Sequence, residues 1–196
     1  MADRDHKYIF WLDLETTGSD LEVPSDIVGV NVRHVILEIG AAITDMSLNV
    51  LDGREIVIGH QIAMENVKPV VVDMHTKNGL WKDVAKSNVR MGEADNELAE
   101  WIKRFNGNDH MAFAGSGIMH FDRKFIRRDM PLVDKRLTHW GIDVGVIRRT
   151  FKYLLGSDEW PEDSKDHRAY GDVLFHIEEM KFALDKMRKG VYNEGS

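Results

Sequence analysis

The sequence predicts an α/β fold: a mixed sheet, with three antiparallel strands followed by parallel strands, flanked by helices. Two observations predict this order. Strand-like apolar runs fill the first third of the chain, and short apolar runs alternate with helical patterns in the rest. A chain that passes from consecutive strands to alternating strands and helices builds an antiparallel and then a parallel part of one sheet.

Three apolar runs have strand character and are expected at residues 7–13, 35–45 and 55–63. Asp52 and Gly53 carry a turn signal between the second and third runs, so they predict a hairpin there. Residues 19–34 are polar and contain Pro24 and Gly29, which predicts a loop between the first two strands.

Helical spacing begins at residues 92–105, where Leu98, Trp101 and Ile102 fall on one face. The further elements expected are a strand at 111–115, a helix at 120–129, a short strand at 141–144 and a long helix at 168–188. We find no internal repeat and no linker. The sequence therefore predicts one domain over residues 1–196, with its core at about 7–188 and a flexible tail at 189–196.

Composition narrows the class of protein. Hydrophobic residues make up 43% of the 196 residues and charged residues 30%, an ordinary globular balance. The absence of cysteine excludes disulfides, thiolate zinc sites and cysteine nucleophiles. The start of the chain is charged, and no apolar run approaches the roughly 20 residues of a membrane span. We expect no signal peptide, no membrane partner and a cytoplasmic protein.

The net charge of −7 argues against a protein that coats nucleic acid by neutralising phosphates. An enzyme whose bound cations offset its own carboxylates remains compatible with this charge.

The first candidate site motif is Asp13-x-Glu15, at the end of the first predicted strand. Residues i and i+2 of a strand point to the same face, and two carboxylates beside an apolar run are costly unless a cation lies between them. Hard oxygen ligands of this kind suit Mg²⁺ or Mn²⁺. The alternative is a strand end that meets solvent, with Thr16, Thr17 and Gly18 forming a turn.

Two further motifs lie later in the chain. His167 and Asp172 open the last predicted helix; if His167 precedes the first turn, its imidazole can lean toward the site that Asp172 faces. A histidine accepts a proton near neutral pH. Asp122 lies between the strand at 111–115 and the following helix. Taken singly, these residues also fit a helix-start histidine, an exposed acid and an acid that favours a helix dipole.

Together and in this order, the three motifs resemble those of the histidine-containing branch of the DEDD exonuclease superfamily, which has a ribonuclease H-like fold. The resemblance covers about residues 8–188. Within the superfamily the amino-acid sequence is most similar to that of oligoribonucleases, in the segments DLETTG, ILEIGAAITD, MHTKNGL at 74–80, FDRKFIRRDMP and IDVGVIRR at 142–149.

The resemblance implies a metal-dependent 3′–5′ exonuclease. Asp13, Glu15, Asp122 and Asp172 would hold two divalent cations, Mg²⁺ or Mn²⁺, and His167 would take the proton from the attacking water. Nucleoside 5′-monophosphates would leave from the 3′ ends of single-stranded RNA or DNA. The expected substrate-binding residues are Thr16, Thr17, Gly18, His75, Arg123 and Arg127. For His75 a surface loop, and for the two arginines a solvated helix face, remain open alternatives.

The chain departs from the oligoribonuclease pattern at four places. Ser19 replaces a leucine that wedges between bases, and Val70 lies where the family has a tryptophan. Gly141 matches a tyrosine that the partner subunit contributes in that family, and Gly117 matches an asparagine. The base-capping pocket for very short RNA is thus incomplete. We expect an exonuclease that accepts longer strands.

Three alternatives remain. The first is a homodimeric oligoribonuclease that degrades di- to pentaribonucleotides, the second a proofreading exonuclease beside a polymerase, and the third a non-catalytic nucleic-acid-binding protein. A series of substrate lengths separates the first from a relaxed exonuclease. The third should lack an acid or the histidine, and this chain keeps all five.

Overall fold

The sheet has five strands in the order β5-β4-β1-β6-β7. The computed structural model describes residues 6–24, 31–157, 159–162 and 167–193. β1 pairs antiparallel with β4, and β4 with β5, whereas β6 runs parallel to both β1 and β7. The strands are β1 (Tyr8–Thr16), β4 (Ile36–Asp45), β5 (Val50–Val57), β6 (Met111–Gly115) and β7 (Leu137–Asp143). The predicted mixed sheet is confirmed.

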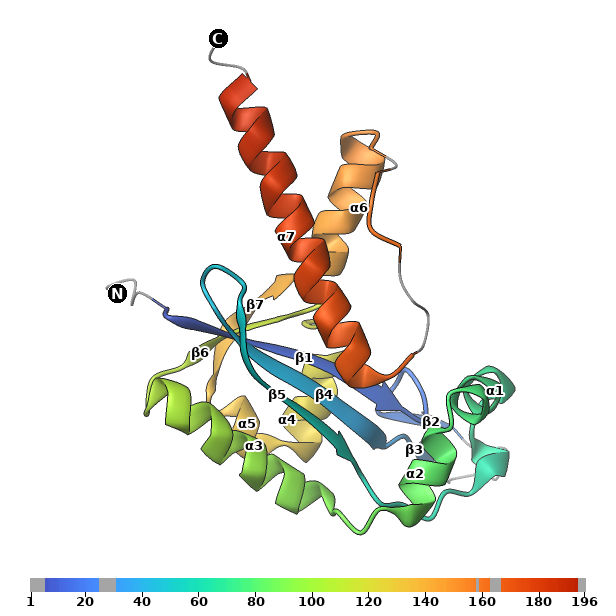
Figure 1. Cartoon of the computed structure of the whole chain (residues 1–196). Coiled ribbons are helices and arrows are strands. Elements are labelled where there is room, and N and C mark those ends of the chain that lie inside the picture. The colour runs from blue at the N-terminus through green and yellow to red at the C-terminus, as the bar shows by residue number, and fades with distance from the viewer. Residues whose placement is uncertain (1–5, 25–30, 158, 163–166, 194–196) are drawn as a thin grey trace.

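Helices cover both faces of this sheet (Figure 1). They are α1 (Pro69–Lys77), α2 (Leu80–Lys86), α3 (Met91–Asn106), α4 (Asp122–Asp129), α5 (Pro131–Asp134), α6 (Val144–Leu154) and α7 (Ala169–Asn193), with a short 3-10 helix η1 (Met64–Asn66). One core lies between the sheet and α3 and α4, and another between the sheet and α7. Among the described helices none is both long and apolar enough to cross a membrane.

β1 supplies both cores because alternate residues point to opposite faces. Phe10 and Leu12 pack into the core under α3. Ile9 and Trp11 pack into the core under α7. By the same alternation, the α7 face of β1 continues from these apolar residues into Asp13, and then Glu15, toward the carboxyl end of the strand.

The second and third strands form the predicted hairpin, but the predicted position of its turn was wrong. The chain turns after Asp45, whose carboxylate accepts hydrogen bonds from the main-chain N–H groups of Ser47 and Asn49, each at 2.9 Å. Asp52 and Gly53 lie inside β5 instead. Gly53 is needed there for packing, since a Cβ atom on it would lie 2.1 Å from the Tyr170 hydroxyl oxygen. β5 begins at Val50 and ends at Val57, so both of its ends come earlier in the chain than those of the predicted strand at 55–63.

Other boundaries also shifted. The predicted loop at 19–34 contains two short paired strands, β2 (Glu22–Pro24) and β3 (Asn31–Arg33). Residues 25–30, with Gly29, lie outside the described part of the chain. β7 begins before the predicted 141–144, and α1, α2 and α6 were not predicted. α7 continues to Asn193, into the tail expected to be flexible, and residues 194–196 lie outside the description. The predictions at 35–45, 92–105 and 111–115 are confirmed.

Candidate active site

Three carboxylates meet above the sheet. Asp13 and Glu15 come from the end of β1, and Asp172 from the first turn of α7. One oxygen from each lies within 4.8 Å of the others. The close approach of α7 depends on Gly40, which lies opposite Asp13 in β4. A Cβ atom on Gly40 would lie 2.1 Å from the main-chain carbonyl carbon of Ala169, so a side chain here would push the start of α7 off the sheet.

Asp122 lies beside this cluster, at the first turn of α4. It follows β6, which is parallel to β1, so the carboxyl ends of both strands reach the same edge of the sheet. Its side chain is buried, and its Oδ1 atom makes no hydrogen bond within the described part of the chain. Burial, and then the Asp13 carboxylate, hold the pKa of Asp122 well above its ordinary value. Asp122 is thus an electrostatic neighbour of Asp13 and Glu15.

Glu15 is also surrounded by negative charge. Burial raises the pKa of Glu15 to about 9, with further contributions from the carboxylates of Asp13, Asp172 and Glu38, and Arg168 opposes the rise. Carboxylates that resist ionisation when close together become favourable ligands once a divalent cation lies among them. An all-oxygen donor set with one unpaired buried oxygen fits Mg²⁺ or Mn²⁺.

His75 lies next to Glu15, one of the clustered carboxylates. It lies in α1 rather than in the surface loop considered above, and its side chain is fully buried. Its Nε2 atom is 3.7 Å from Glu15 Oε2 and 3.4 Å from the Thr16 carbonyl oxygen. Burial lowers the pKa of His75, which favours the neutral ring. In this position His75 contacts a cluster residue, and its ring has no exposed surface to offer a nucleotide.

His167 lies just before α7, which meets the condition for its side chain to lean toward the site of Asp172. Its side chain is exposed. A positive charge on His167 would lower the pKa of His75, so the two rings are electrostatic neighbours at the side of the cluster. The structure therefore brings all five predicted catalytic residues to one region of the molecule.

The turn after β1 is held by its own hydroxyl groups. Thr16 Oγ1 donates to the Gly18 carbonyl oxygen at 2.9 Å. Thr17 Oγ1 accepts from the Val35 N–H at 3.0 Å and lies 3.2 Å from His34 Nδ1. With both side chains engaged inside the protein, a substrate-binding role for Thr16, Thr17 and Gly18 falls to their main chain.

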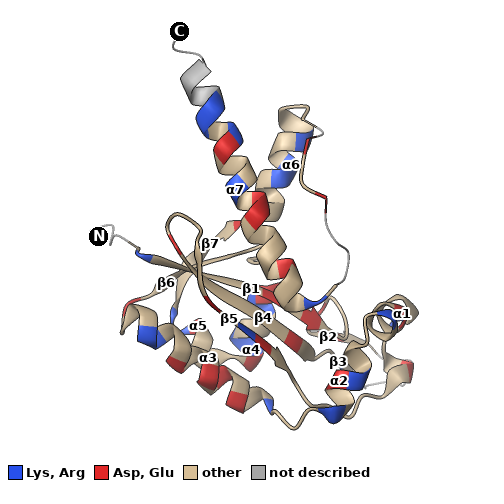
Figure 2. Ribbon diagram, in the orientation of Figure 1, with Lys and Arg blue, Asp and Glu red and all other residues tan. Residues whose placement is uncertain are grey.

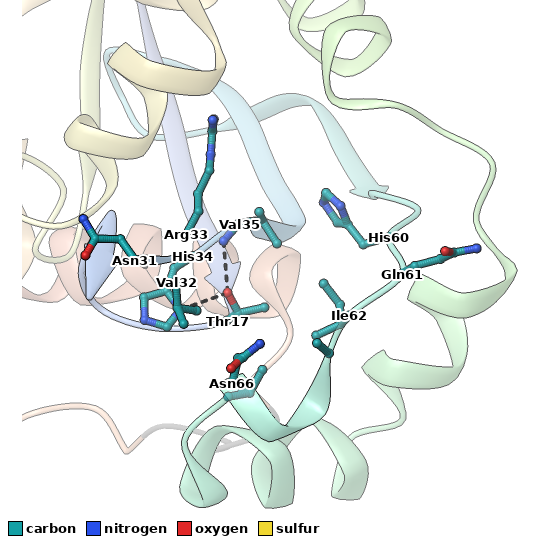
Figure 3. Close-up of a pocket in the computed structure, with 12 residues that line it drawn as sticks. Thr17, Asn31, Val32, Arg33, His34, Val35, His60, Gln61, Ile62 and Asn66 are labelled. Atoms are coloured by element: carbon teal, nitrogen blue, oxygen red, sulfur yellow. Dashed lines mark hydrogen bonds between the residues drawn. The ribbon is translucent and has the colours of Figure 1, made fainter. Parts of the chain in front are cut away.

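A pocket of about 360 Å³ opens on the far side of this turn (Figure 3). Thr17 and His34 form one wall, and the segment from His60 to Val67 forms the other. The His60 ring is itself fixed, with Nε2 2.9 Å from the Ile36 carbonyl oxygen. The pocket lies beside the turn, and its lining does not include the clustered carboxylates.

The basic stripe expected after Asp122 is divided between the interior and the surface. Arg123 is turned inward, where it pairs with Asp134 at 2.8 Å and donates to the Thr138 carbonyl oxygen at 2.9 Å. Its side chain is only 5% exposed, which leaves little surface for contact with a phosphate. Arg128 likewise donates to main-chain carbonyls, whereas Arg127 is exposed to solvent.

Arg168, which adjoins His167, was not predicted as a functional residue. Its guanidinium binds the buried carboxylate of Glu38, which lies in β4. An acid inside an otherwise apolar strand was a usable signal, because a buried carboxylate requires a partner. The sequence does not identify that partner, which is 130 residues away.

The comparisons with known proteins agree with this geometry. The exonuclease family model RNase_T matches residues 10–180. The chain is 32% identical to an oligoribonuclease of Nocardia farcinica, over 90% of this chain and 79% of that protein. It is 30% identical to a probable oligoribonuclease of Dictyostelium discoideum, over 89% of this chain and 87% of that protein.

Solved structures support the fold. An exonuclease I from Methylocaldum szegediense superposes on 93% of this chain with a TM-score of 0.68 and 16% identity. A metal-free complex of Escherichia coli exonuclease I with single-stranded DNA gives a TM-score of 0.61 at 16% identity. The matched region is 41% of each of those longer chains. The matched family model and the oligoribonuclease relatives together show that this chain belongs to the exonuclease family and is a 3′–5′ exonuclease that acts on nucleic acid.

Proposed function

We propose that the chain removes nucleoside 5′-monophosphates one at a time from the 3′ ends of single-stranded RNA or DNA, using two divalent cations. The observation that carries this proposal is the meeting of Asp13, Glu15 and Asp172 within 4.8 Å, with buried Asp122 beside them. Four ionised carboxylates and two divalent cations carry equal and opposite charge. The site would be neutral before the substrate phosphate arrives.

In this proposal, Asp13 would serve both cations, Glu15 and Asp172 would help to hold one of them, and Asp122 would mainly help to hold the other. When bound, such a pair supplies electrostatic stabilisation to the attacking and leaving oxygens of an in-line displacement. The chain's own part is to orient these carboxylates. β1 fixes two of them on one face, and the packing of α7 on Gly40 sets the position of the third.

His167 is the proposed general base. Its side chain is exposed to solvent and lies just ahead of α7, whose first turn carries Asp172. His75, which is buried and favours the neutral form, is unsuited to this exchange with solvent. The role of His167 is to accept the proton of the attacking water at an imidazole nitrogen.

We propose that the enzyme accepts strands longer than oligoribonucleotides. Gly141 packs so closely that a Cβ atom on it would lie 2.7 Å from Met119 Sδ, so a tyrosine does not fit without rearrangement. Val70 is 71% exposed and offers a small surface where the family has a tryptophan. The second candidate is an oligoribonuclease in the strict sense, which is favoured by relatives of that name at 30–33% identity.

We also propose that residues 1–196 form one exonuclease domain. Its two larger cores lie on opposite faces of the five-stranded sheet, and both receive side chains from β1.

The test is a gel assay on 5′-labelled RNA and DNA, from dinucleotides to strands of about two dozen nucleotides. Reactions contain Mg²⁺, Mn²⁺ or EDTA. Asp172→Asn removes a cluster carboxylate, and Asp185→Asn is its control, because Asp185 lies on the same helix in a surface pair with Lys189. A cation-dependent ladder that shortens from the 3′ end, lost only in Asp172→Asn, is expected. Cleavage confined to di- to pentaribonucleotides would favour the second candidate, and cleavage by Asp172→Asn at the wild-type rate would overturn the site.

A further inference from the structure

Arg168 joins the start of α7 to three other elements. Its Nε and Nη2 atoms donate to Glu38 Oε1 of β4 at 2.9 and 2.5 Å. Nη2 also donates to Glu55 of β5, and Nη1 donates to Asp83 of α2, both at 3.1 Å. A planar guanidinium suits such an arrangement because its donors are fixed in direction. The residue that follows His167 is therefore anchored to the sheet and to α2.

Glu38 extends this anchor to the helix itself. Its side chain is fully buried, and its Oε2 atom accepts a hydrogen bond from the Ala169 N–H at 2.9 Å. A carboxylate at this place satisfies a main-chain donor at the start of α7 and favours the helix dipole. One buried acid thus holds both Arg168 and Ala169.

His167 is fixed from the other side by Asn78. The Asn78 Nδ2 atom donates to the His167 carbonyl oxygen at 2.5 Å, while Asn78 Oδ1 accepts from the Leu80 N–H at 3.0 Å. The link runs from the corner between α1 and α2 to the segment before α7. His167 has a φ angle of +46°, in the left-handed region. Residues other than glycine keep such a conformation only where their surroundings hold it.

We propose that Asn78 and Arg168 are positioning residues that fix the main chain of His167 at the side of the acidic cluster. This inference rests on the proposed role of His167 as general base. The hydrogen bonds of Asn78 and Arg168 hold the main chain on either side of the imidazole and leave the ring itself to meet water. Because proton transfer depends on alignment to a fraction of an ångström, loosening this main chain lowers the rate of the chemical step.

Asn78 is the cleaner probe of the two. Arg168 also lowers the pKa of Glu15, so its replacement changes the charge of the cluster as well as the position of His167. Asn78 is neutral. Asn78→Ser keeps an oxygen for the Leu80 N–H but is too short to reach His167, and Asn78→Ala loses both contacts; neither variant changes the charge. Lys77→Ala is the matched control, because the neighbouring Lys77 only pairs with Asp73 on the surface of α1.

We expect kcat on a labelled single strand to fall about 10-fold in both Asn78 variants, with KM within about 2-fold of wild type. Lys77→Ala should match wild type in both constants. Arg168→Lys keeps the positive charge but lacks the planar set of donors. It should also lower kcat and leave KM near the wild-type value. A rise in KM with unchanged kcat, or a fall in Asn78→Ala alone, would overturn the proposal.

A double-mutant cycle with His167→Ala decides whether Asn78 acts through His167. If it does, adding Asn78→Ser to His167→Ala causes no further loss of kcat. An equal loss in both backgrounds would overturn the positioning role. If His167→Ala is impaired and Asn78→Ser is not, the positioning proposal fails alone. If His167→Ala keeps the wild-type kcat, the general-base assignment fails, and the positioning proposal fails with it. Melting temperatures of all variants separate misfolding from these outcomes.

Discussion

Glu15 shows how a single residue can be well placed for catalysis and unfavourable for the fold. Its carboxyl is buried beside two others, and its pKa is raised to about 9. We predict that Glu15→Gln abolishes cleavage, by about 10³-fold or more, and raises the melting temperature of the cation-free protein at pH 8. Thermal unfolding in EDTA, alongside the gel assay, measures both effects. A melting temperature below that of wild type would show that the crowding of carboxylates does not strain the fold.

The same residue predicts how stability depends on pH. Its folded-state pKa lies above its unfolded value, so the folded protein binds a proton more tightly than the unfolded chain. The free energy of unfolding in EDTA therefore falls as pH rises from about 5 to about 9. Denaturant titrations across this range should show the fall, and Glu15→Gln should reduce it. A stability that rises over the same range in EDTA would contradict the assignment.

Predictions for single residues from the sequence succeeded where the regular alternation of side chains along a strand determines which face a residue lies on. Asp13 and Glu15 share a face because a strand alternates, and the structure brings them together with Asp172. Arg123 and Arg127 belong to one helix, yet one is buried against Asp134 and the other is exposed. The direction of Arg123 depends on a tertiary partner, which a local pattern does not contain.

At the scale of elements, the contact between α7 and β4 sets the geometry of the site. We predict that Gly40→Ala lowers stability by roughly 1–3 kcal/mol and also lowers kcat, because the added methyl group meets the Ala169 main chain. Gly92→Ala is the control. It lies exposed in α3 with open space around its Cβ position, and should be neutral or stabilising by about 0.5 kcal/mol. Chemical denaturation and steady-state kinetics on both variants make the comparison. Wild-type activity in Gly40→Ala would show that α7 can shift without moving Asp172 from the cluster.

The prediction of helices and strands failed where residues typical of a turn are present for another reason. Asp52 and Gly53 look like a turn, but Gly53 makes room for Tyr170 and Asp52 accepts a hydrogen bond from Trp101 Nε1 at 2.9 Å. α1 begins with a run of valines, which favours a strand by propensity, although Pro69 at its first position is a helix-start signal. By contrast, α3 keeps its apolar residues at helical spacing and was predicted to within one residue at each end.

At the scale of the whole molecule, the negative net charge affects how tightly the enzyme binds a single strand. The net charge is −7, and both α3 and α7 carry acidic as well as basic residues (Figure 2). We therefore predict that binding of a labelled single strand depends on divalent cations and weakens about 10-fold or more in EDTA. Fluorescence anisotropy with Ca²⁺ or EDTA measures this. Equal affinity in both conditions would mean that an extended cationic surface, and not the acidic cluster, holds the strand.

The last prediction concerns assembly. α6 and α7 project beyond the sheet (Figure 1), and the end of α6 exposes Tyr153, Leu154 and Leu155 by 71%, 78% and 66%. Neighbouring apolar side chains exposed to this degree are typical of an interaction surface. The resemblance to oligoribonucleases implies a homodimer, and we propose that this end of α6 contributes to a two-fold interface.

We expect sedimentation to show a dimer for wild type and a monomer for Tyr153→Glu/Leu154→Glu. The control is Leu132→Glu, which places a charge at an exposed position of α5 and should remain dimeric. By the resemblance, Gly141 matches the tyrosine that each oligoribonuclease subunit contributes to its partner. With no such side chain to exchange, the monomeric variant should cleave long strands at the wild-type rate. A monomeric wild type would contradict the assembly, whereas a dimer whose activity is lost on dissociation would show that another partner residue completes the site.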